Sequence, residues 1–253
     1  MDFLTHEKDL NYSFGIFRVK INYDDGMKMT KNEILADLRK KILEEQYVQG
    51  QSLVERNICE TYGVSRTPIR EVLWSLVADG VVEQRPAGGF SVRKLDWKKV
   101  FEIFQAREAV EGMAARLASK QSDRNSLSIL EKLRDELHEV DIEQDSIEGT
   151  RIGRLIHLEV IKASSNQLLS EIYVKLSYLS ALTTNIAKYN VRTEQASKAH
   201  HLAIIDAIIA GDAENSEHYM RQHLKVTCRN LIEILYPQFV SAITEGIDAS
   251  FAL

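Results

Sequence analysis

The order of short elements over residues 30–92 constrains the fold of this chain more than any other feature. Three helical patterns come first, with a turn at Gly63 between the second and the third, and PAGG then joins VVEQ to FSVRKL. Thr30 and Glu33 have the spacing of a capping box, and Pro68 lies in a first helical turn, where its missing N–H is not needed. The helices are expected over 30–47, 53–62 and 65–80. Helix, turn, helix and β-hairpin wing together predict a winged helix-turn-helix.

The rest of the chain, from Asp96 on, carries no strand signal and is predicted to be helical. Its first pattern places Val100, Ile103, Phe104 and Val110 at helical spacing. Six amphipathic stretches span 97–119, 123–144, 148–164, 166–189, 193–210 and 212–235. The fold class is therefore predicted to be mainly α, with three helices and a wing followed by an all-α bundle of six or seven helices.

The sequence divides into four segments. An N-terminal extension, residues 1–29, alternates apolar residues with smaller or polar ones, which fits an edge strand or hairpin and fits disorder equally well. The winged helix-turn-helix, a DNA-binding fold, is predicted over 30–95, the helical domain over 96–236 and a tail over 237–253.

Charge is divided unevenly between the two predicted domains. The chain of 253 residues has a formal net charge of −5, yet residues 28–94 hold eleven Lys and Arg against nine Asp and Glu. This excess of two positive charges is too small for a generally basic surface. Any contact with DNA must therefore come from a few specifically positioned arginines. No targeting signal and no apolar run near the roughly 20 residues of a membrane span is evident, so we expect a cytoplasmic protein without membrane contact.

Polar side chains gather at the start of the third predicted helix. In a helix-turn-helix this end enters the major groove, where arginine makes bidentate contacts with guanine and free N–H groups favour phosphate. In the wing, Arg85 and the turn Gly88-Gly89 are candidates for contacts with phosphate or the minor groove. The alternative to DNA contact is that the arginines are ordinary solvated surface residues and that the wing is a plain surface hairpin. The candidates on the helix are Ser65, Arg66, Thr67 and Arg70.

The run GVSRTPIREVLWSLVADGVVEQRPAGGFSV resembles the winged helix of the GntR family, and the likeness spans about residues 34–92. In that family a stretch of the SRTPxREAL type opens the recognition helix. The resemblance implies a transcriptional repressor or activator that binds a double-stranded DNA operator. It also implies a DNA contact from Arg56 on the preceding helix, although Leu53-Val54-Glu55 lacks the small polar lead-in of many members.

Three histidines lie near apolar residues on three different helical stretches of the bundle. Imidazoles from three helices can converge inside a bundle and bind a divalent metal, for which zinc and nickel are equally suitable. Separate, hydrogen-bonded core histidines are the alternative. The three are His157, His201 and His223.

The stretches RLIHLEVIKASSNQLL and HLAIIDAIIAGDAENSEHYMRQHL resemble the FCD effector domain of the FadR-type subfamily, and six helices fit its VanR-like branch. This resemblance implies that His157, His201 and His223 are metal ligands. The family's fourth ligand, an Asp or Asn, falls on Gly153. A water, the effector or no metal at all would then occupy the fourth place.

The same resemblance implies a small-molecule effector, such as an organic acid, a sugar acid or a fatty acyl derivative. An anionic ligand needs a cation in its cavity, and Arg107 is the candidate. A surface ion pair with Glu111, four residues on, is the alternative. In a homodimer on a pseudo-palindromic operator, the effector would favour one of two arrangements of the DNA-binding domains, with the region of Asp96 as the lever.

Two other functions fit parts of the sequence. A metal-dependent hydrolase or oxygenase would use the three histidines with Glu159 or Asp206 as general base, yet neither residue lies in a catalytic motif. An architectural DNA-binding protein would need no effector. Because the winged helix and the helical domain both fit a regulator, we predict a ligand-responsive transcriptional regulator that is not an enzyme.

Overall fold

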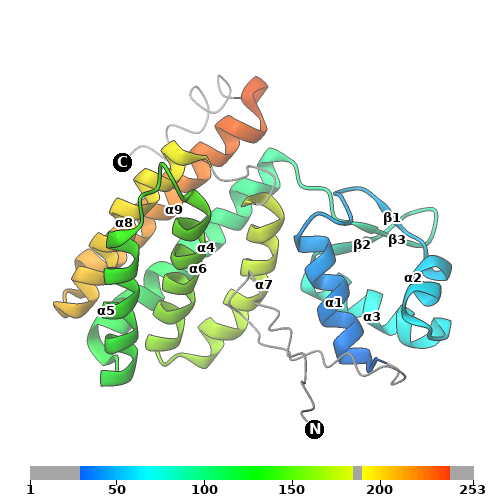
Figure 1. Ribbon diagram of the computed structural model, residues 1–253, viewed down its shortest axis with the longest axis horizontal. Helices are drawn as coiled ribbons and strands as arrows, with labels where there is room; N and C mark the ends of the chain where they lie inside the picture. Colours follow the sequence, from blue (N-terminus) through cyan, green and yellow to red (C-terminus); the bar gives the residue numbers. More distant parts are fainter. Residues whose placement is uncertain (1–28, 185–189, 240–253) are drawn as a thin grey trace, which may run out of the picture.

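The computed structural model describes residues 29–184 and 190–239, which form a small N-terminal domain beside a larger helical domain (Figure 1). The strand or hairpin predicted in the N-terminal extension lies outside the described residues, as does the tail after Phe239. Both described domains have the predicted fold class.

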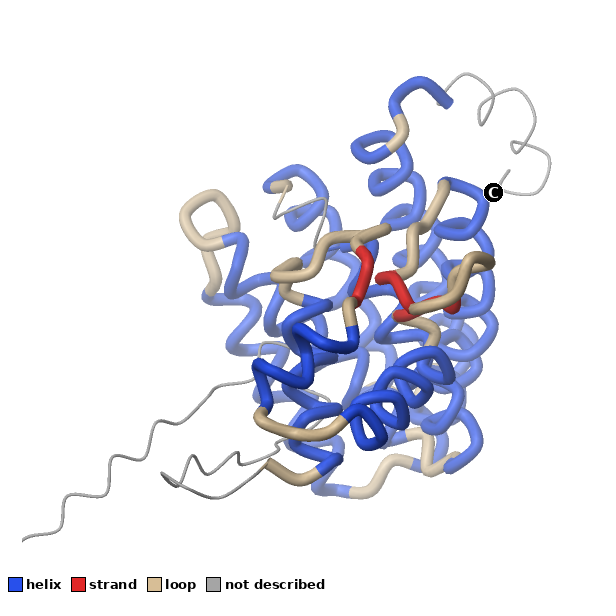
Figure 2. The backbone as a smooth tube through the Cα atoms, turned by 90° about the vertical axis from the view of Figure 1, so that its right-hand side faces the viewer, coloured by secondary structure: helices blue, strands red, loops and turns tan. Residues whose placement is uncertain are grey.

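The N-terminal domain combines three helices with a three-stranded antiparallel sheet in the order β1-β3-β2. Figure 2 shows the short strands close together, framed by helices. This arrangement confirms the predicted winged helix-turn-helix. Its elements are α1 (Lys31–Leu43), β1 (Ser52–Leu53), α2 (Glu55–Tyr62), α3 (Arg66–Asp79), β2 (Val82–Gln84) and β3 (Phe90–Val92).

Local chemistry sets the limits of these helices. At the start of α1 the backbone N–H of Thr30 donates to the Glu33 carboxylate over 2.7 Å, and the N–H of Glu33 donates to the Thr30 hydroxyl over 3.3 Å. This is the capping box that the sequence predicts. Gly63 ends α2 in the left-handed region at φ 63°, where a residue without a Cβ is favoured.

The strand β1 differs from the prediction. The helix expected from residue 53 begins only at Glu55, because Ser52–Leu53 pairs with β3 instead. In this strand Leu53 pairs with Phe90 and is buried in the domain core. Through β1, the segment before α2 is thus hydrogen-bonded to β3 of the wing.

The C-terminal domain has six helices in its described part, as predicted, and ends in a short 3₁₀ helix, η1 (Pro237–Phe239). The helix α4 is central because it packs against α6, α7, α8 and α9. Within the described ranges, no helix is both long and apolar enough to cross a membrane. The six are α4 (Trp97–Gln121), α5 (Arg124–Glu139), α6 (Ser146–Ala163), α7 (Gln167–Thr184), α8 (Val191–Ile209) and α9 (Ala213–Leu235).

All six of these helices begin with an acidic or amide side chain that accepts a hydrogen bond from the backbone N–H three residues on. Such a cap stabilises a helix by about 1 kcal/mol, because it satisfies an N–H that has no partner inside the helix. The bundle helices therefore start where the sequence dictates locally. The caps are Asp96, Asp123, Asp145, Asn166, Asn190 and Asp212.

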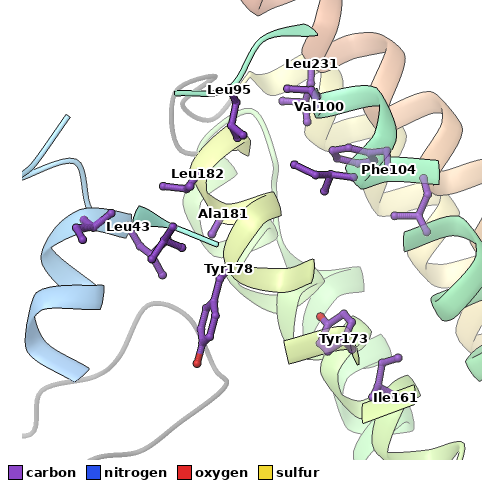
Figure 3. Close-up of a cluster of buried hydrophobic side chains, with 14 of the residues drawn as sticks. Leu43, Leu95, Val100, Phe104, Ile161, Tyr173, Tyr178, Ala181, Leu182 and Leu231 are labelled. Atoms are coloured by element: carbon purple, nitrogen blue, oxygen red, sulfur yellow. The ribbon is translucent and has the colours of Figure 1, made fainter. Parts of the chain in front are cut away.

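The helix α7 lies between the bundle and the N-terminal domain (Figure 1). Figure 3 shows Tyr178 and Leu182 directed toward the side on which Leu43 of α1 lies. The Tyr178 ring centre is 4.7 Å from the guanidinium carbon of Arg39, and Arg39 is paired with Asp79 of α3 at 2.6 Å. One aromatic side chain of α7 thus contacts a pair that joins α1 to α3.

Gln49 adds a polar connection between the domains. Its side-chain amide donates to the carbonyl of Leu182 over 2.8 Å and accepts from the backbone N–H of Leu95 over 2.9 Å. Tyr236 donates to the Leu95 carbonyl over 2.7 Å. The segment before α4 is therefore held by both domains.

We expect Tyr178→Ala to uncouple the two domains. The ring is almost fully buried, so its removal leaves a cavity at the interface and costs about 3 kcal/mol of interdomain stabilisation. Scanning calorimetry should then show two unfolding transitions where the parent protein shows one. Tyr178→Phe, which keeps the ring over Arg39, should behave as the parent protein. An unaltered transition in the alanine variant would contradict the assigned contact.

Candidate DNA-binding surface and histidine site

The first two turns of α3 carry the polar side chains predicted to contact DNA, and all four are exposed. The hydroxyl of the N-cap Ser65 makes no capping hydrogen bond, so it is not used within the helix. The opposite face of α3 is buried in the domain core, which fixes the direction of the polar face. That buried face comprises Ile69, Val72, Leu73 and Leu76.

The arginines near this helix differ in their partners. Within the residues that the structure describes, Arg66 has no ion pair, whereas Arg70 lies 3.3 Å from Glu55 and Arg56 lies 3.8 Å from Glu60. Both pairs are at the surface, and the side chain of Arg70 remains 62% exposed. Exposed ion pairs contribute about 0–1 kcal/mol, so a phosphate or a base edge can replace the carboxylate.

In the wing, Arg85 is oriented by the strand that the sequence did not predict. Its Nη1 donates to the hydroxyl of Ser52 in β1 over 2.7 Å. The exposed turn beyond it contains Gly88 and Gly89 at φ 89° and 80°, in the left-handed region. Two backbone hydrogen bonds close this turn, from the N–H of Gly88 to the Arg85 carbonyl over 2.9 Å and from the N–H of Arg85 to the Gly89 carbonyl over 3.0 Å.

The three predicted histidines come together inside the bundle. His157 of α6, His201 of α8 and His223 of α9 are all buried. The Nε2 atom of His157 lies 3.0 Å from Nε2 of His223 and 3.2 Å from Nε2 of His201. A fourth histidine that the sequence analysis did not select, His200, has its ring centre 6.0 Å from that of His223.

Burial keeps the imidazoles of His201 and His223 neutral. It lowers the pKa of His201 and of His223 well below the usual value, and the neighbouring charges of His157 and Arg107 lower both further. Neutral imidazoles at physiological pH keep a lone pair on one ring nitrogen, which is the form that binds a metal.

A buried ion pair adjoins the histidines. Arg107 of α4 donates from Nε to Glu111 over 2.5 Å and from Nη1 to the hydroxyl of Ser180 over 2.8 Å. The other oxygen of Glu111 lies 2.6 Å from Nδ1 of His157, although the ring N–H does not point straight at it. From the sequence, an ion pair of Arg107 with Glu111 was expected only at the surface, as the alternative to effector binding. The contact between Glu111 and His157 was not predicted.

The charge on Glu111 is retained despite its burial. Burial alone would raise the pKa of this carboxyl, but the charges of Arg107 and His157 and the hydrogen bonds that Arg107 donates lower it to about 2. The same carboxylate raises the pKa of Arg107 against the opposing effect of burial. The site therefore contains one fixed negative and one fixed positive charge beside the imidazoles.

Gly153 is the position on which the family resemblance placed a fourth ligand, an Asp or Asn. A Cβ at this position would lie 2.7 Å from Cε1 of His201, which is closer than side chains approach in practice. The His201 ring therefore occupies the space that a side chain at position 153 would need. The glycine at position 153 is therefore what allows the His201 ring to lie where it does.

The histidine cluster has the geometry of a site for a divalent metal. Its ligand nitrogens all lie within 4.8 Å of one another. Two imidazole nitrogens bound to one zinc at ~2.0–2.1 Å lie roughly 3.3 Å apart, which matches the two short Nε2 separations. Borderline-soft imidazoles suit zinc and nickel. His157, His201 and His223 thus fit such an ion, to which Gly153 offers no fourth ligand.

The two carboxylates considered as general bases lie in other contacts. Glu159 is 3.6 Å from Lys162, and the exposed Asp206 is 3.3 Å from Arg134. The candidate metal group found among the described residues contains the three histidines and neither of these acids. The geometry therefore gives no support to a hydrolytic reaction at this site.

Comparison with known proteins identifies both domains. Residues 30–92 match the family described as bacterial regulatory proteins, gntR family, and residues 102–226 match the FCD domain. The HTH-type transcriptional regulator McbR of Escherichia coli (strain K12) is 27% identical over 198 residues, which are 75% of this chain and 85% of that protein. A protein of Paenarthrobacter nicotinovorans named "Probable D-xylose utilization operon transcriptional repressor" is 27% identical over 201 residues, 78% of this chain and 88% of that protein.

Solved structures show the same fold. One of E. coli McbR/YncC has a TM-score of 0.67 and 24% identity, and the match covers 84% of this chain and 100% of that chain. A GntR structure from Rhodococcus sp. RHA1 has a TM-score of 0.66 and 21% identity, with 80% and 97% covered. Relatives of this kind are regulators and not enzymes. The chain therefore belongs to the GntR family, in its FadR-type subfamily with an FCD domain, and is a ligand-responsive, DNA-binding transcriptional regulator.

Proposed function

We propose that the chain binds a pseudo-palindromic operator as a homodimer, with residues 30–95 as the DNA-binding domain and 96–236 as the domain for effector binding and dimerisation. The observation that carries this proposal is the exposed start of α3, where Arg66 has no acidic partner among the described residues. Two such helices in a symmetric dimer meet two half-sites about one helical turn of DNA apart.

Each predicted DNA contact has a role in this proposal. Arg66 and Arg70 reach base edges in the major groove, where arginine recognises guanine through two hydrogen bonds. Arg56 binds the phosphate backbone, and Arg85 with the Gly88-Gly89 turn follows the backbone or the minor groove beside the wing. The hydroxyls at the start of the helix, on Ser65 and Thr67, donate to phosphate together with free backbone N–H groups.

The FCD domain binds its effector at the histidine site. His157, His201 and His223 hold one divalent metal, zinc or nickel, which when bound would supply a Lewis-acidic centre for a carboxylate oxygen. Arg107 is the second attachment point for an organic or sugar acid. Its contacts to Glu111 and Ser180 use three of five N–H groups, so two more are free to donate to a carboxylate.

The position of α7 supports a route from the effector site to the DNA-binding domain. Arg107 contacts Ser180 on one side of this helix, and Tyr178 contacts Arg39 on the other. An effector that binds Arg107 and displaces it favours a different position of α7. Operator affinity then changes by as much as the effector prefers one arrangement of the DNA-binding domains over the other. The segment near Asp96, the lever predicted from the sequence, is anchored through Leu95 to both domains.

The proposal is tested by selecting operators in vitro from fragments of the organism's own DNA. We expect a palindromic site bound by two chains, as measured by light scattering of the complex. Small carboxylic and sugar acids are then screened for release of the operator, and the relative named for a D-xylose operon supports repression of a metabolic operon as the outcome. A monomer bound to a single half-site would contradict the dimer, and an operator affinity unchanged by every acid would contradict the effector class.

A further inference from the structure

The most deeply buried charged group of the described residues is a carboxylate that no DNA contact or effector contact explains. Glu111 is 0% exposed, and it lies on α4, the central helix of the bundle. An uncompensated charge in such a place costs several kcal/mol, so its partners must account for its presence. Those partners are Arg107 on one side and His157 on the other.

Among the three clustered imidazoles, His157 has a distinct environment. Its Nδ1 is 2.6 Å from the Glu111 carboxylate, whereas Nδ1 of His201 lies 3.5 Å from the hydroxyl of Ser197. Nδ1 of His223, like that of His157, makes no hydrogen bond within the described structure, but it also has no described carboxylate at ion-pair distance. A carboxylate on Nδ1 favours the tautomer with its proton there, which leaves the Nε2 lone pair directed at the other two histidines.

We infer that Glu111 is a positioning residue of the metal site, which fixes the ring of His157 with its Nε2 directed at the metal position. The inference rests on the metal site of the proposed function. A carboxylate behind a metal-bound histidine fixes ring orientation and raises the basicity of the ligand nitrogen.

Arg107 gives Glu111 its fixed position. Two of its nitrogens donate to the carboxylate, over 2.5 and 3.3 Å, while a third donation to Ser180 holds the guanidinium against α7. The carboxylate therefore cannot turn away from His157 without breaking a buried ion pair. Metal affinity and the position of α7 are linked through this one side chain.

The test compares zinc binding by the parent protein and by Glu111→Gln, using a chromophoric chelator as competitor. We expect affinity to fall about 10- to 100-fold, the usual effect of removing a carboxylate behind a metal ligand. Glu108→Gln is the matched control, because Glu108 lies one turn earlier on α4 and is paired with Arg221 at 3.4 Å. This control should bind zinc as the parent protein does.

A second variant separates positioning from structural damage. Glu111→Gln leaves Arg107 buried without its anion, whereas Arg107→Met combined with Glu111→Gln leaves no buried charge. The double variant should fold stably and still bind zinc as weakly as the single variant. Recovery of the parent affinity in the double variant would overturn the positioning role, because the loss would then come from the unpaired arginine.

A direct readout of the ring is the tautomer of His157 in the metal-free protein, followed by long-range ¹H–¹⁵N correlation of the histidine side chains. The parent protein should carry the proton on Nδ1, and Glu111→Gln should lose that preference. Equal zinc affinity in the parent protein and in Glu111→Gln would overturn the role of Glu111 alone. Absence of zinc binding by the parent protein would overturn the metal site together with it.

Discussion

Replacing Arg66 by alanine is expected to weaken operator binding by about 1–3 kcal/mol per contacted half-site, or roughly ten- to hundredfold for each. Arg66 is the first residue of α3, is exposed, and has no ion pair within the described residues, so its guanidinium is available to the duplex. Both copies are lost together in a homodimer, so the measured effect should approach twice the free energy. Fluorescence anisotropy with a selected operator at several salt concentrations measures it.

Arg124→Ala is the control for this variant. Arg124 is likewise the exposed first residue of a helix, but that helix is α5 of the bundle. Its loss should leave both the affinity and the salt dependence unchanged. If Arg66→Ala binds operator and non-specific DNA as the parent protein does, with the same slope against salt, α3 does not read the operator.

The winged domain could be predicted because its signals are local. The capping box at Thr30, the left-handed turn at Gly63 and the early proline Pro68 each act within one helical turn. None of them depends on contacts with distant parts of the chain. The exception is β1, whose two residues pair with β3 nearly forty positions later, and only that non-local pairing makes a strand of them.

The histidine site was predicted in its residues but not in its surroundings. Spacing places each histidine near an apolar helix face and allows the three to converge, and family resemblance favours it, yet the convergence itself depends on how α6, α8 and α9 pack. Arg107 and Glu111 are four residues apart, as in a common surface pair. The helices that cover α4 turn this pair into a buried one and bring it against His157. No local signal carries that information.

The strongest effect in the FCD domain is expected from His223→Ala, which should abolish the stabilisation of the protein by zinc. Two imidazoles, from α6 and α8, remain in the variant, and two ligands do not hold the ion against water. At a zinc concentration of about 100 times its dissociation constant, the parent protein should gain about 2.7 kcal/mol of stability, seen as a higher unfolding temperature. The variant should gain almost none.

The comparison is made between each protein with zinc and the same protein with a chelator, because removal of a buried ring also lowers the stability of the metal-free form. His218→Ala serves as control, since His218 is an exposed histidine of the same helix and should leave the zinc-induced gain intact. An equal gain in His223→Ala would mean that the ion binds elsewhere. The three histidines would then be neutral members of the core, and an acidic effector would have to rely on Arg107 alone.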